Sequence, residues 1–150
     1  MRPFLRPSTR PAALAALLLA AAGLLAACGT TVSLDEPIEA RSWQLVSIRS
    51  QPMAQDTDAQ RGAHLQFDGK RVDGSGGCNR ISGSYQRSGH TLRLGPLVAT
   101  RMACIDPARS IIETDFLAAL QETRQYSLAG GNRLTLLDGG GRTLAVLESR

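Results

Sequence analysis

Closely spaced turn signals, with short alternating segments between them, restrict the fold of this chain more than any other feature. Turn signals recur roughly every 8–12 residues through the second two thirds of the chain, and Asp68-Gly69 and Ser88-Gly89 are typical hairpin turns. Between the turns, apolar residues occupy every second position, as Leu134 and Leu136 do, which is the period of a strand with one buried face. The pattern predicts an antiparallel meander. Its strands are expected at 43–48, 64–67, 71–73, 81–85, 91–94, 126–128, 134–136 and 144–146, with loops at 49–61 and 74–77.

One segment, 106–121, has the period of a helix instead. Its apolar residues recur at helical spacing, at Ile112, Phe116, Ala119 and Leu120. Glu113, Thr114 and Gln121 are expected to face away from this apolar stripe. The stripe would then pack against the sheet.

The start of this helix has two candidates. Asp106 before Pro107 is one, and Ser110 with Glu113 three residues later forms a capping box that could be the other. We favour Asp106, because proline is well tolerated at the first helical position. The expected fold class is therefore α+β, mainly β: a strongly curved antiparallel sheet or a partly closed small barrel with one helix.

The chain opens with the layout of a secretory signal. Arg2, Arg6 and Arg10 supply a basic start, and an apolar run of alanine and leucine with one glycine extends from 12 to 27. The ending Leu25-Ala26-Ala27-Cys28 resembles a bacterial lipobox. In such a sequence, the leader is cut just before a cysteine whose sulfur carries a lipid.

This resemblance implies lipidation at Cys28. Gly29 follows the cysteine, which in such lipoproteins favours the outer membrane, so we expect an outer-membrane lipoprotein facing the periplasm. Two other interpretations stay open. An uncleaved anchor would need roughly 20 apolar residues to span a membrane, more than this run offers. A plain secretory signal would leave Cys28 without a role.

Removing the leader changes the charge of the chain. The full sequence has 17 basic and 13 acidic residues. Three of the arginines lie in the leader, which leaves 14 basic residues against 13 acidic ones and a net charge of +1. Nucleic acid is therefore not an expected partner. The mature length suits one domain, and we divide the chain into a signal peptide (1–27), a lipidated N-terminus and tether (28–41) and a domain (42–150).

Cys78 and Cys104 form the strongest chemical feature of the domain. With Cys28 assigned to the lipid, an even number of cysteines remains in an oxidising compartment. A disulfide between them would close a loop of about 27 residues and would stabilise the fold by roughly 3–4 kcal/mol. Two separately buried thiols are the alternative. A metal site is disfavoured, because no Cys-x-x-Cys occurs and His64 and His90 lie at unrelated spacing.

Two strings distinguish the domain: Cys78-Asn79-Arg80-Ile81-Ser82-Gly83-Ser84-Tyr85 and Ala99-Thr100-Arg101-Met102-Ala103-Cys104. Together with a Glu-x-x-Phe-x-x-x-Leu pattern in the helix and the opening Trp43-x-Leu45, they closely resemble the META domain of HslJ-like heat-inducible bacterial lipoproteins. The resemblance covers 42–148. It implies a small β-rich domain in the cell envelope, linked to heat shock and novobiocin tolerance, with no established catalytic activity.

Asn79, Arg80, Arg101 and Met102 are the candidate binding or motif residues. A polar pair beside a constrained cysteine can form a binding patch, or it can satisfy the backbone groups of a neighbouring turn. We favour the structural role for Asn79 and Arg80, whereas Arg101 has the same ambiguity. Met102 is more typical of a core or gap-filling position than of a ligand contact.

No catalytic residue is expected. The sequence lacks a Gly-x-Ser-x-Gly elbow, and neither histidine has an obvious carboxylate to orient it. We likewise expect no cofactor and no metal.

The sequence thus predicts a non-enzymatic, lipid-anchored envelope protein that supports stress tolerance by binding an unidentified partner. One alternative is a carrier that holds an apolar or lipidic ligand inside a half-open barrel. Another is a pilot or assembly factor for a secreted or outer-membrane protein, in which an exposed sheet edge captures an extended segment.

Overall fold

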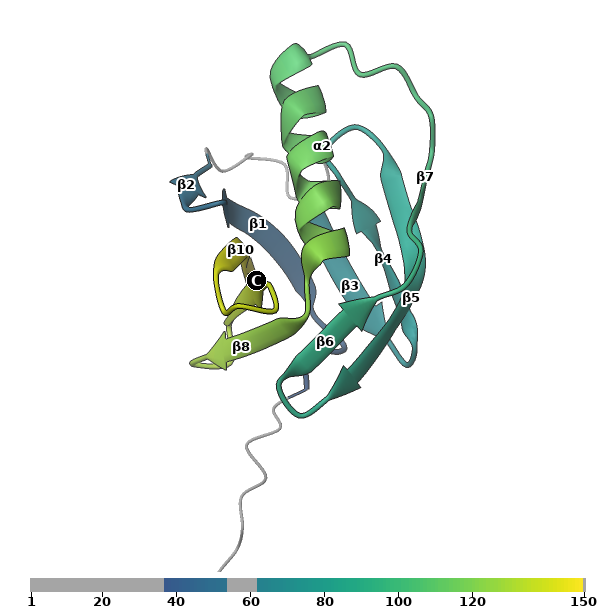
Figure 1. The fold of residues 1–150 in the computed structure, drawn as a ribbon. Coiled ribbons are helices and arrows are strands. Elements are labelled where there is room, and N and C mark those ends of the chain that lie inside the picture. Colours follow the sequence, from purple (N-terminus) through teal and green to yellow (C-terminus); the bar gives the residue numbers. More distant parts are fainter. Residues whose placement is uncertain (1–36, 54–61, 150) are drawn as a thin grey trace, which may run out of the picture. The chain divides into compact units, whose positions relative to one another are not determined.

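The structure is a computed structural model that describes residues 37–53 and 62–149. Its main strands form a closed antiparallel barrel (Figure 1). These strands are β1 (Ser42–Ile48), β3 (His64–Asp68), β4 (Arg71–Ser75), β5 (Arg80–Ser88), β6 (Thr91–Leu94), β8 (Gln125–Ala129), β9 (Arg133–Leu137) and β10 (Thr143–Ser149). They follow one another around the barrel in the order β1-β3-β4-β5-β6-β8-β9-β10, and pairing of β10 with β1 closes the ring. The predicted α+β class, mainly β and antiparallel, is confirmed.

Two short strands lie outside this ring. β2 (Gln51–Pro52) pairs with β1, and β7 (Val98–Ala99) pairs with β5. The sequence predicted neither of them. Two residues are too few to show an alternating period, and Pro52 is tolerated in a sheet only at an edge.

Gly74 lies inside β4, where the sequence predicted a loop. It pairs with Leu65 on β3 and with Ile81 on β5. A Cβ atom at this position would lie 2.0 Å from the carbonyl oxygen of His64, so the backbones approach too closely for any side chain. The expected loop is therefore wrong for Gly74 and Ser75, because this glycine marks a close backbone contact and not a turn.

Side chains fill the interior of the barrel, as is usual for eight strands. The largest fully buried ones include Trp43, Leu65, Phe67, Phe116, Leu134, Leu136 and Leu147. The rings of Phe67 and Tyr85 meet edge to face, with their centroids 5.0 Å apart. The interior is therefore occupied by the protein's own core.

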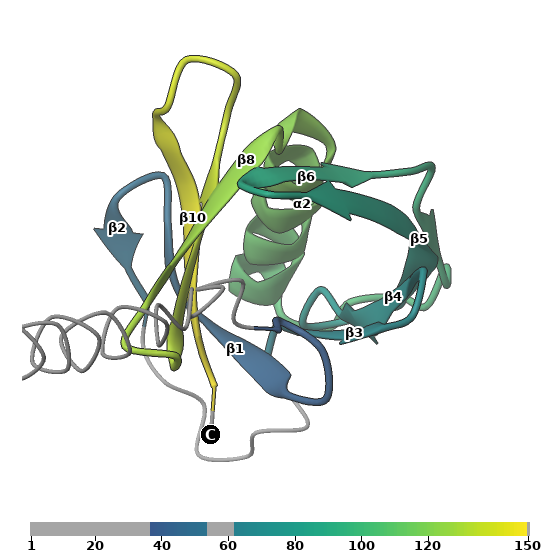
Figure 2. The same cartoon turned by 90° about the horizontal axis from the view of Figure 1, so that it is seen from below.

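The helix α2 (Pro107–Glu122) packs against β1, β6, β9 and β10, and Figure 2 shows strands on several sides of it. Phe116 and Leu120 are fully buried, as the helical spacing predicts. The helix begins at the favoured candidate, where the Asp106 carboxylate accepts a hydrogen bond from the Ala108 backbone N–H at 2.9 Å. The predicted helix and its start are confirmed.

Residues ahead of β1 belong to the packed domain. Ile38 is fully buried, and its carbonyl oxygen accepts a hydrogen bond from the indole N–H of Trp43 at 2.7 Å. The Tyr85 hydroxyl donates to Glu39 at 2.7 Å. Burial and this hydrogen bond raise the pKa of Tyr85, so the hydroxyl keeps its proton. The domain thus begins before Ser42, earlier than the division of the sequence placed it.

The proposed signal peptide (1–27) and Cys28 lie outside the described residues, as does the tether up to residue 36. Lipidation of Cys28 therefore stays a prediction. Within 37–53 and 62–149, no helix is both long enough and apolar enough to cross a membrane.

Candidate functional site

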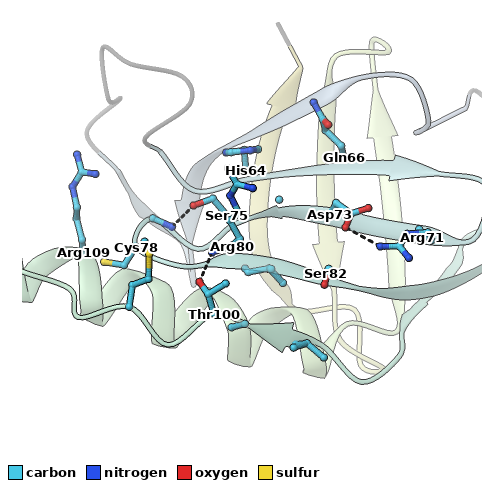
Figure 3. A pocket seen from close by; sticks show the side chains of 16 residues that line it. His64, Gln66, Arg71, Asp73, Ser75, Cys78, Arg80, Ser82, Thr100 and Arg109 are labelled. Carbon is cyan, nitrogen blue, oxygen red and sulfur yellow. Dashed lines mark hydrogen bonds and ion pairs between the residues drawn. The ribbon is translucent and has the colours of Figure 1, made fainter.

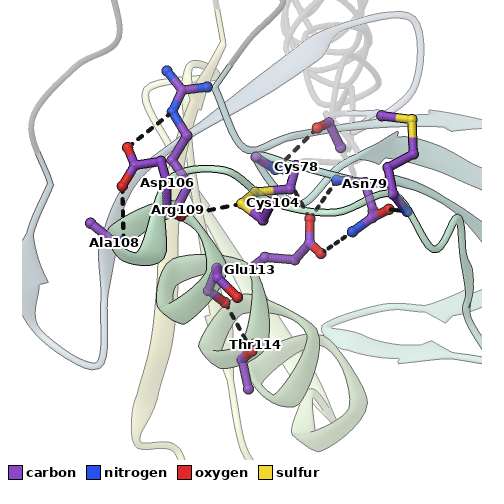
Figure 4. Close-up of a disulfide and its surroundings, with 12 residues drawn as sticks. Cys78, Asn79, Cys104, Asp106, Ala108, Arg109, Glu113 and Thr114 are labelled. Atoms are coloured by element: carbon purple, nitrogen blue, oxygen red, sulfur yellow. Dashed lines mark hydrogen bonds and ion pairs between the residues drawn. A yellow bond between two sulfur atoms is a disulfide. The ribbon is translucent and has the colours of Figure 1, made fainter.

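Cys78 and Cys104 are joined by a disulfide, with their Cα atoms 5.5 Å apart (Figure 4). Cys78 lies just before β5, and Cys104 lies in the segment between β7 and α2. The predicted pairing is confirmed over the alternative of two separate thiols. The bond ties the segment that leads into the helix to the start of a barrel strand.

The buried carboxylate of Glu113, on α2, is hydrogen-bonded to the residues at the start of β5, and we call this set of hydrogen bonds the brace. Glu113 accepts hydrogen bonds from the backbone N–H groups of Cys78 at 3.0 Å and Asn79 at 2.6 Å, and from the Asn79 side-chain amide at 2.6 Å (Figure 4). Only 9% of Glu113 is exposed. A Cβ atom on Gly76 would lie 2.5 Å from the Glu113 side chain. The glycine therefore leaves room for the carboxylate.

The expectation that Glu113 faces away from the core is wrong. Helical periodicity treats a carboxylate as an outward residue, but three donors from another segment satisfy this one inside the protein. A signal was present in the sequence. Glu113 lies three residues before Phe116 and seven before Leu120, which places all three on one helix face.

Two opposing effects act on the Glu113 carboxyl. Burial raises its pKa, whereas hydrogen bonds from the Asn79 side chain and from the Asn79 and Cys78 backbones lower it. The net result is a pKa below the ordinary value, so Glu113 is charged at neutral pH. The brace is thus a set of charge-assisted hydrogen bonds, which are stronger than neutral ones.

Asn79 connects this brace to the segment after β7. Its side-chain oxygen accepts hydrogen bonds from the Thr100 hydroxyl at 2.9 Å and from the Met102 backbone N–H at 2.8 Å. Its amide nitrogen donates to Glu113, and the residue is 8% exposed. These bonds give Asn79 the structural role considered from the sequence, with its polar atoms engaged inside the protein.

The outer face of the neighbouring sheet is hollowed into a groove, which we call the outer groove (Figure 3). Its floor consists of two cross-strand rows on β3, β4 and β5: His64, Ser75 and Arg80 in one, and Gln66, Asp73 and Ser82 in the other. Because successive residues of a strand face opposite sides, Leu65 and Ile81 between these rows point into the core. The register of three strands therefore creates the site.

The outer groove has a volume of about 930 Å³. Ser75 and Ser82 are short and lie between longer side chains, which makes the floor concave. Val98 and Met102 form an apolar wall, and they are 68% and 63% exposed. Met102 is thus a wall residue whose side chain meets solvent, so the expectation of a core position for it is wrong.

Arg80 differs from the other arginines of the outer groove. Arg71 lies 3.3 Å from the Asp73 carboxylate, and Arg109 lies 3.8 Å from that of Asp106. No side-chain hydrogen bond or ion pair joins Arg80 to any residue of the described ranges. Figure 3 shows its side chain extending across the floor toward His64. The structural role favoured for Arg80 is therefore wrong for its side chain, because within the described ranges the guanidinium satisfies no backbone group and is presented inside a concavity.

The other candidates are not brought into the outer groove. Arg101 is exposed beside it without lining it. His90 follows β5 at the hairpin, whereas His64 lies on β3. Among the described residues, no group of three or more histidine, cysteine, aspartate or glutamate side chains could hold a metal ion.

Comparison with known proteins gives a family and a fold. The model of the META domain matches residues 36–150. A protein from Burkholderia xenovorans solved by NMR is 26% identical, with a TM-score of 0.59 over 75% of this chain and 83% of that one. A second NMR structure is also 26% identical, with a TM-score of 0.58 over 74% of this chain and 90% of the other.

A DUF4847 family protein from Bacteroides vulgatus, solved by crystallography, shares the fold at 18% identity. Its TM-score is 0.55 over 75% of this chain and 94% of that one. No curated protein sequence matches the chain.

Proposed function

Because this chain belongs to the META domain family, we propose that it is a non-enzymatic envelope protein that binds a partner through the outer groove. A lipid on Cys28 would hold it at the outer membrane, facing the periplasm. Binding of the partner, an envelope protein, would support tolerance of heat and antibiotic stress. The family is not a known enzyme family.

One observation carries this proposal. The large apolar side chains that the described residues expose lie in a single stretch: Val98, Met102, Ile105 and Ile111, each at least 63% exposed. Single exposed apolar residues are normal on a protein surface, but a contiguous group marks an interaction site. Val98 and Met102 of this group line the outer groove, which offers polar contacts beside the apolar ones.

The stretch is also held in place before any partner arrives. The disulfide fixes it at Cys104, and Asn79 fixes it at Thr100 and Met102. A surface that is already ordered loses less conformational entropy on binding, and so binds more tightly for the same contacts.

The outer groove lies at the end of β5 away from the N-terminal segment. Glu39 contacts Tyr85 and Arg87 near the C-terminal end of β5, whereas Asn79 precedes its N-terminal end. At about 3.3 Å per residue, these two ends are roughly 25 Å apart.

The two alternatives fare differently. Carriage of an apolar ligand in the barrel interior has little geometric support, since side chains fill that space. Capture of an extended segment has one favourable feature: among residues 37–53 and 62–149, β7 pairs on one side only, with β5. Its second edge could accept a strand. Native mass spectrometry of the protein from its own cells separates the two, through a retained apolar molecule or a retained polypeptide.

The proposal predicts that changes in the apolar wall abolish function without unfolding the domain. In a strain that lacks the protein, we expect wild type to restore survival of heat and novobiocin. Val98→Asp combined with Met102→Asp should fail to restore it, because charge on the wall opposes apolar contact. Melting temperature and cell content of the variant should match those of wild type.

A matched control is available on the opposite part of the barrel. Gln125→Asp with Ser127→Asp introduces the same two charges at exposed positions of β8, and it should restore survival fully. Full survival with the wall variant, or no defect in the strain that lacks the protein, would contradict the proposal.

Anchoring is tested separately. Cys28→Ala should leave an unlipidated protein in the precursor or soluble fraction, because the cysteine sulfur is the attachment point. Membrane fractionation and gel mobility measure this. Unchanged membrane retention and mobility would refute the anchor while leaving the outer groove untouched.

A further inference from the structure

Resting on the proposed binding role of the outer groove, we infer that this groove recognises a carboxylate on its partner through Arg80. The Ser75 hydroxyl on the adjacent strand assists as a neutral donor, and the apolar wall holds the body that carries the carboxylate. The expected ligand class is a carboxylate attached to an aliphatic chain, as in an acidic segment of polypeptide.

The geometry of one cross-strand row supports this role. Arg80 and Ser75 are directly paired on β5 and β4, so their side chains are neighbours on the outer face. A guanidinium presents its N–H groups in a planar fork that matches the two oxygens of a carboxylate. Because the Arg80 guanidinium has no partner among the described residues, forming this pair breaks no existing ion pair.

Ser75 supplies a second donor. Its hydroxyl oxygen accepts a hydrogen bond from the Gly77 backbone N–H at 3.0 Å, which leaves the hydroxyl proton to be donated elsewhere. On the other side of the row, the Nδ1 atom of His64 lies 2.9 Å from the Gly62 carbonyl oxygen. A carbonyl only accepts, so Nδ1 carries the ring proton and this interaction fixes the ring.

The charge of the floor favours a monoanion. Arg71 and Asp73 form a pair, so Arg80 contributes the one uncompensated charge of the two rows. Asp73 stands diagonally from Arg80 in the neighbouring row, at about 7–8 Å. A phosphate carries about 1.5–2 negative charges near neutral pH, and the second charge would meet the field of Asp73. A carboxylate brings a single charge.

Val98 and Met102 are positioned to contact the aliphatic part of the ligand. Val98 is paired with Ser82 across β5 and β7, and both apolar residues line the outer groove next to the floor. An aliphatic group attached to the bound carboxylate would cover this wall. The same ligand thus uses the charge and the apolar surface together.

Acetate and acetamide are suitable probes, because they share a shape and differ in charge. We would titrate each into the mature lipoprotein in detergent micelles at constant ionic strength, and follow the ¹H–¹⁵N resonances of the Arg80 side chain and the Ser75 and Ser82 backbones. Acetate should shift these resonances in a saturable manner, with a Kd at least tenfold lower than that of acetamide. Butyrate should bind more tightly than acetate, because it reaches the apolar wall.

Two variants complete the test. Arg80→Gln should weaken acetate binding at least tenfold. Arg101→Gln removes another exposed arginine just outside the outer groove and should leave binding unchanged. Equal responses to acetate and acetamide, an unaltered response in Arg80→Gln, or inorganic phosphate binding tenfold more tightly than acetate would each overturn the inference.

This outcome is distinguishable from failure of the proposed function. Acetate binding together with full survival of the wall variant would support carboxylate recognition and refute the stress role. Loss of survival with no acetate response would refute carboxylate recognition and leave partner binding in place.

Discussion

Replacement of Glu113 by alanine is expected to lower the melting temperature of the domain by about 12–16 °C, which corresponds to roughly 3–4 kcal/mol of unfolding free energy. The variant removes the acceptor for the Cys78 and Asn79 backbones and for the Asn79 amide. Hydrogen bonds to a charged group contribute about 1.5–3 kcal/mol each, and the donors left behind are largely buried. Thermal unfolding followed by circular dichroism measures the effect.

Glu122→Ala is the matched control. Glu122 lies on the same helix, and its side chain is 50% exposed in a surface pair with Arg49. Exposed pairs of this kind contribute about 0–1 kcal/mol, so the melting temperature should change by no more than about 4 °C. Similar falls in melting temperature for the Glu113 and Glu122 variants would show that the brace contributes no more to stability than an exposed ion pair.

Acid titration separates the charge of Glu113 from its shape. Its pKa in the folded protein is below the ordinary value of 4.5, so the folded state favours the ionised form. The resulting stability is fully present above about pH 4.5 and is lost as the pH falls through the folded-state pKa. Glu113→Gln should reduce the slope of unfolding free energy against pH in this window. Asp138, whose pKa is also lowered by the Arg142 backbone N–H and side chain, should keep part of the slope.

Removal of the disulfide is expected to have an effect of the same size. Cys78→Ser combined with Cys104→Ser should cost roughly 3–4 kcal/mol, because the unfolded chain regains the freedom of a loop of about 27 residues. The melting temperature should fall by about 12–16 °C. Thermal unfolding in the presence and absence of a thiol reductant measures this.

Each single serine variant should be as unstable as the double variant, since either one breaks the same bond. Reductant should destabilise wild type and leave the double variant unchanged. Additive losses from the two single variants, or a double variant as stable as wild type, would contradict this account.

Much of the fold could be predicted from local patterns. Hairpin turns such as Asp68-Gly69 and the alternation in Leu134 and Leu136 are properties of neighbouring residues, and the structure confirms the strands between them. Closure of the barrel could not be predicted with the same certainty. It depends on pairing of β1 with β10, whose residues are about a hundred positions apart. The loop expected at Gly74 was wrong for the same reason, because the close contact of Gly74 with the His64 carbonyl joins two different strands.

The candidate site, too, could be predicted from the sequence only in part. The disulfide followed from a count of cysteines and a compartment, whereas the brace did not, because it joins Glu113 to a turn 34 residues away in sequence. The sequence motif identified Arg80 as a candidate residue, but it did not predict the groove in which Arg80 lies. Only the register of β3, β4 and β5 places it beside Ser75 on a concave face.

The hydrogen bond from Trp43 to the Ile38 carbonyl gives the domain an optical reporter. Trp43 is the sole tryptophan of the sequence, and it is fully buried where the chain enters the barrel. Its fluorescence emission therefore reports on the surroundings of Trp43 alone, without an added label. Strain applied through the N-terminal segment, if it detaches Ile38, should shift that emission to longer wavelengths before the strands separate.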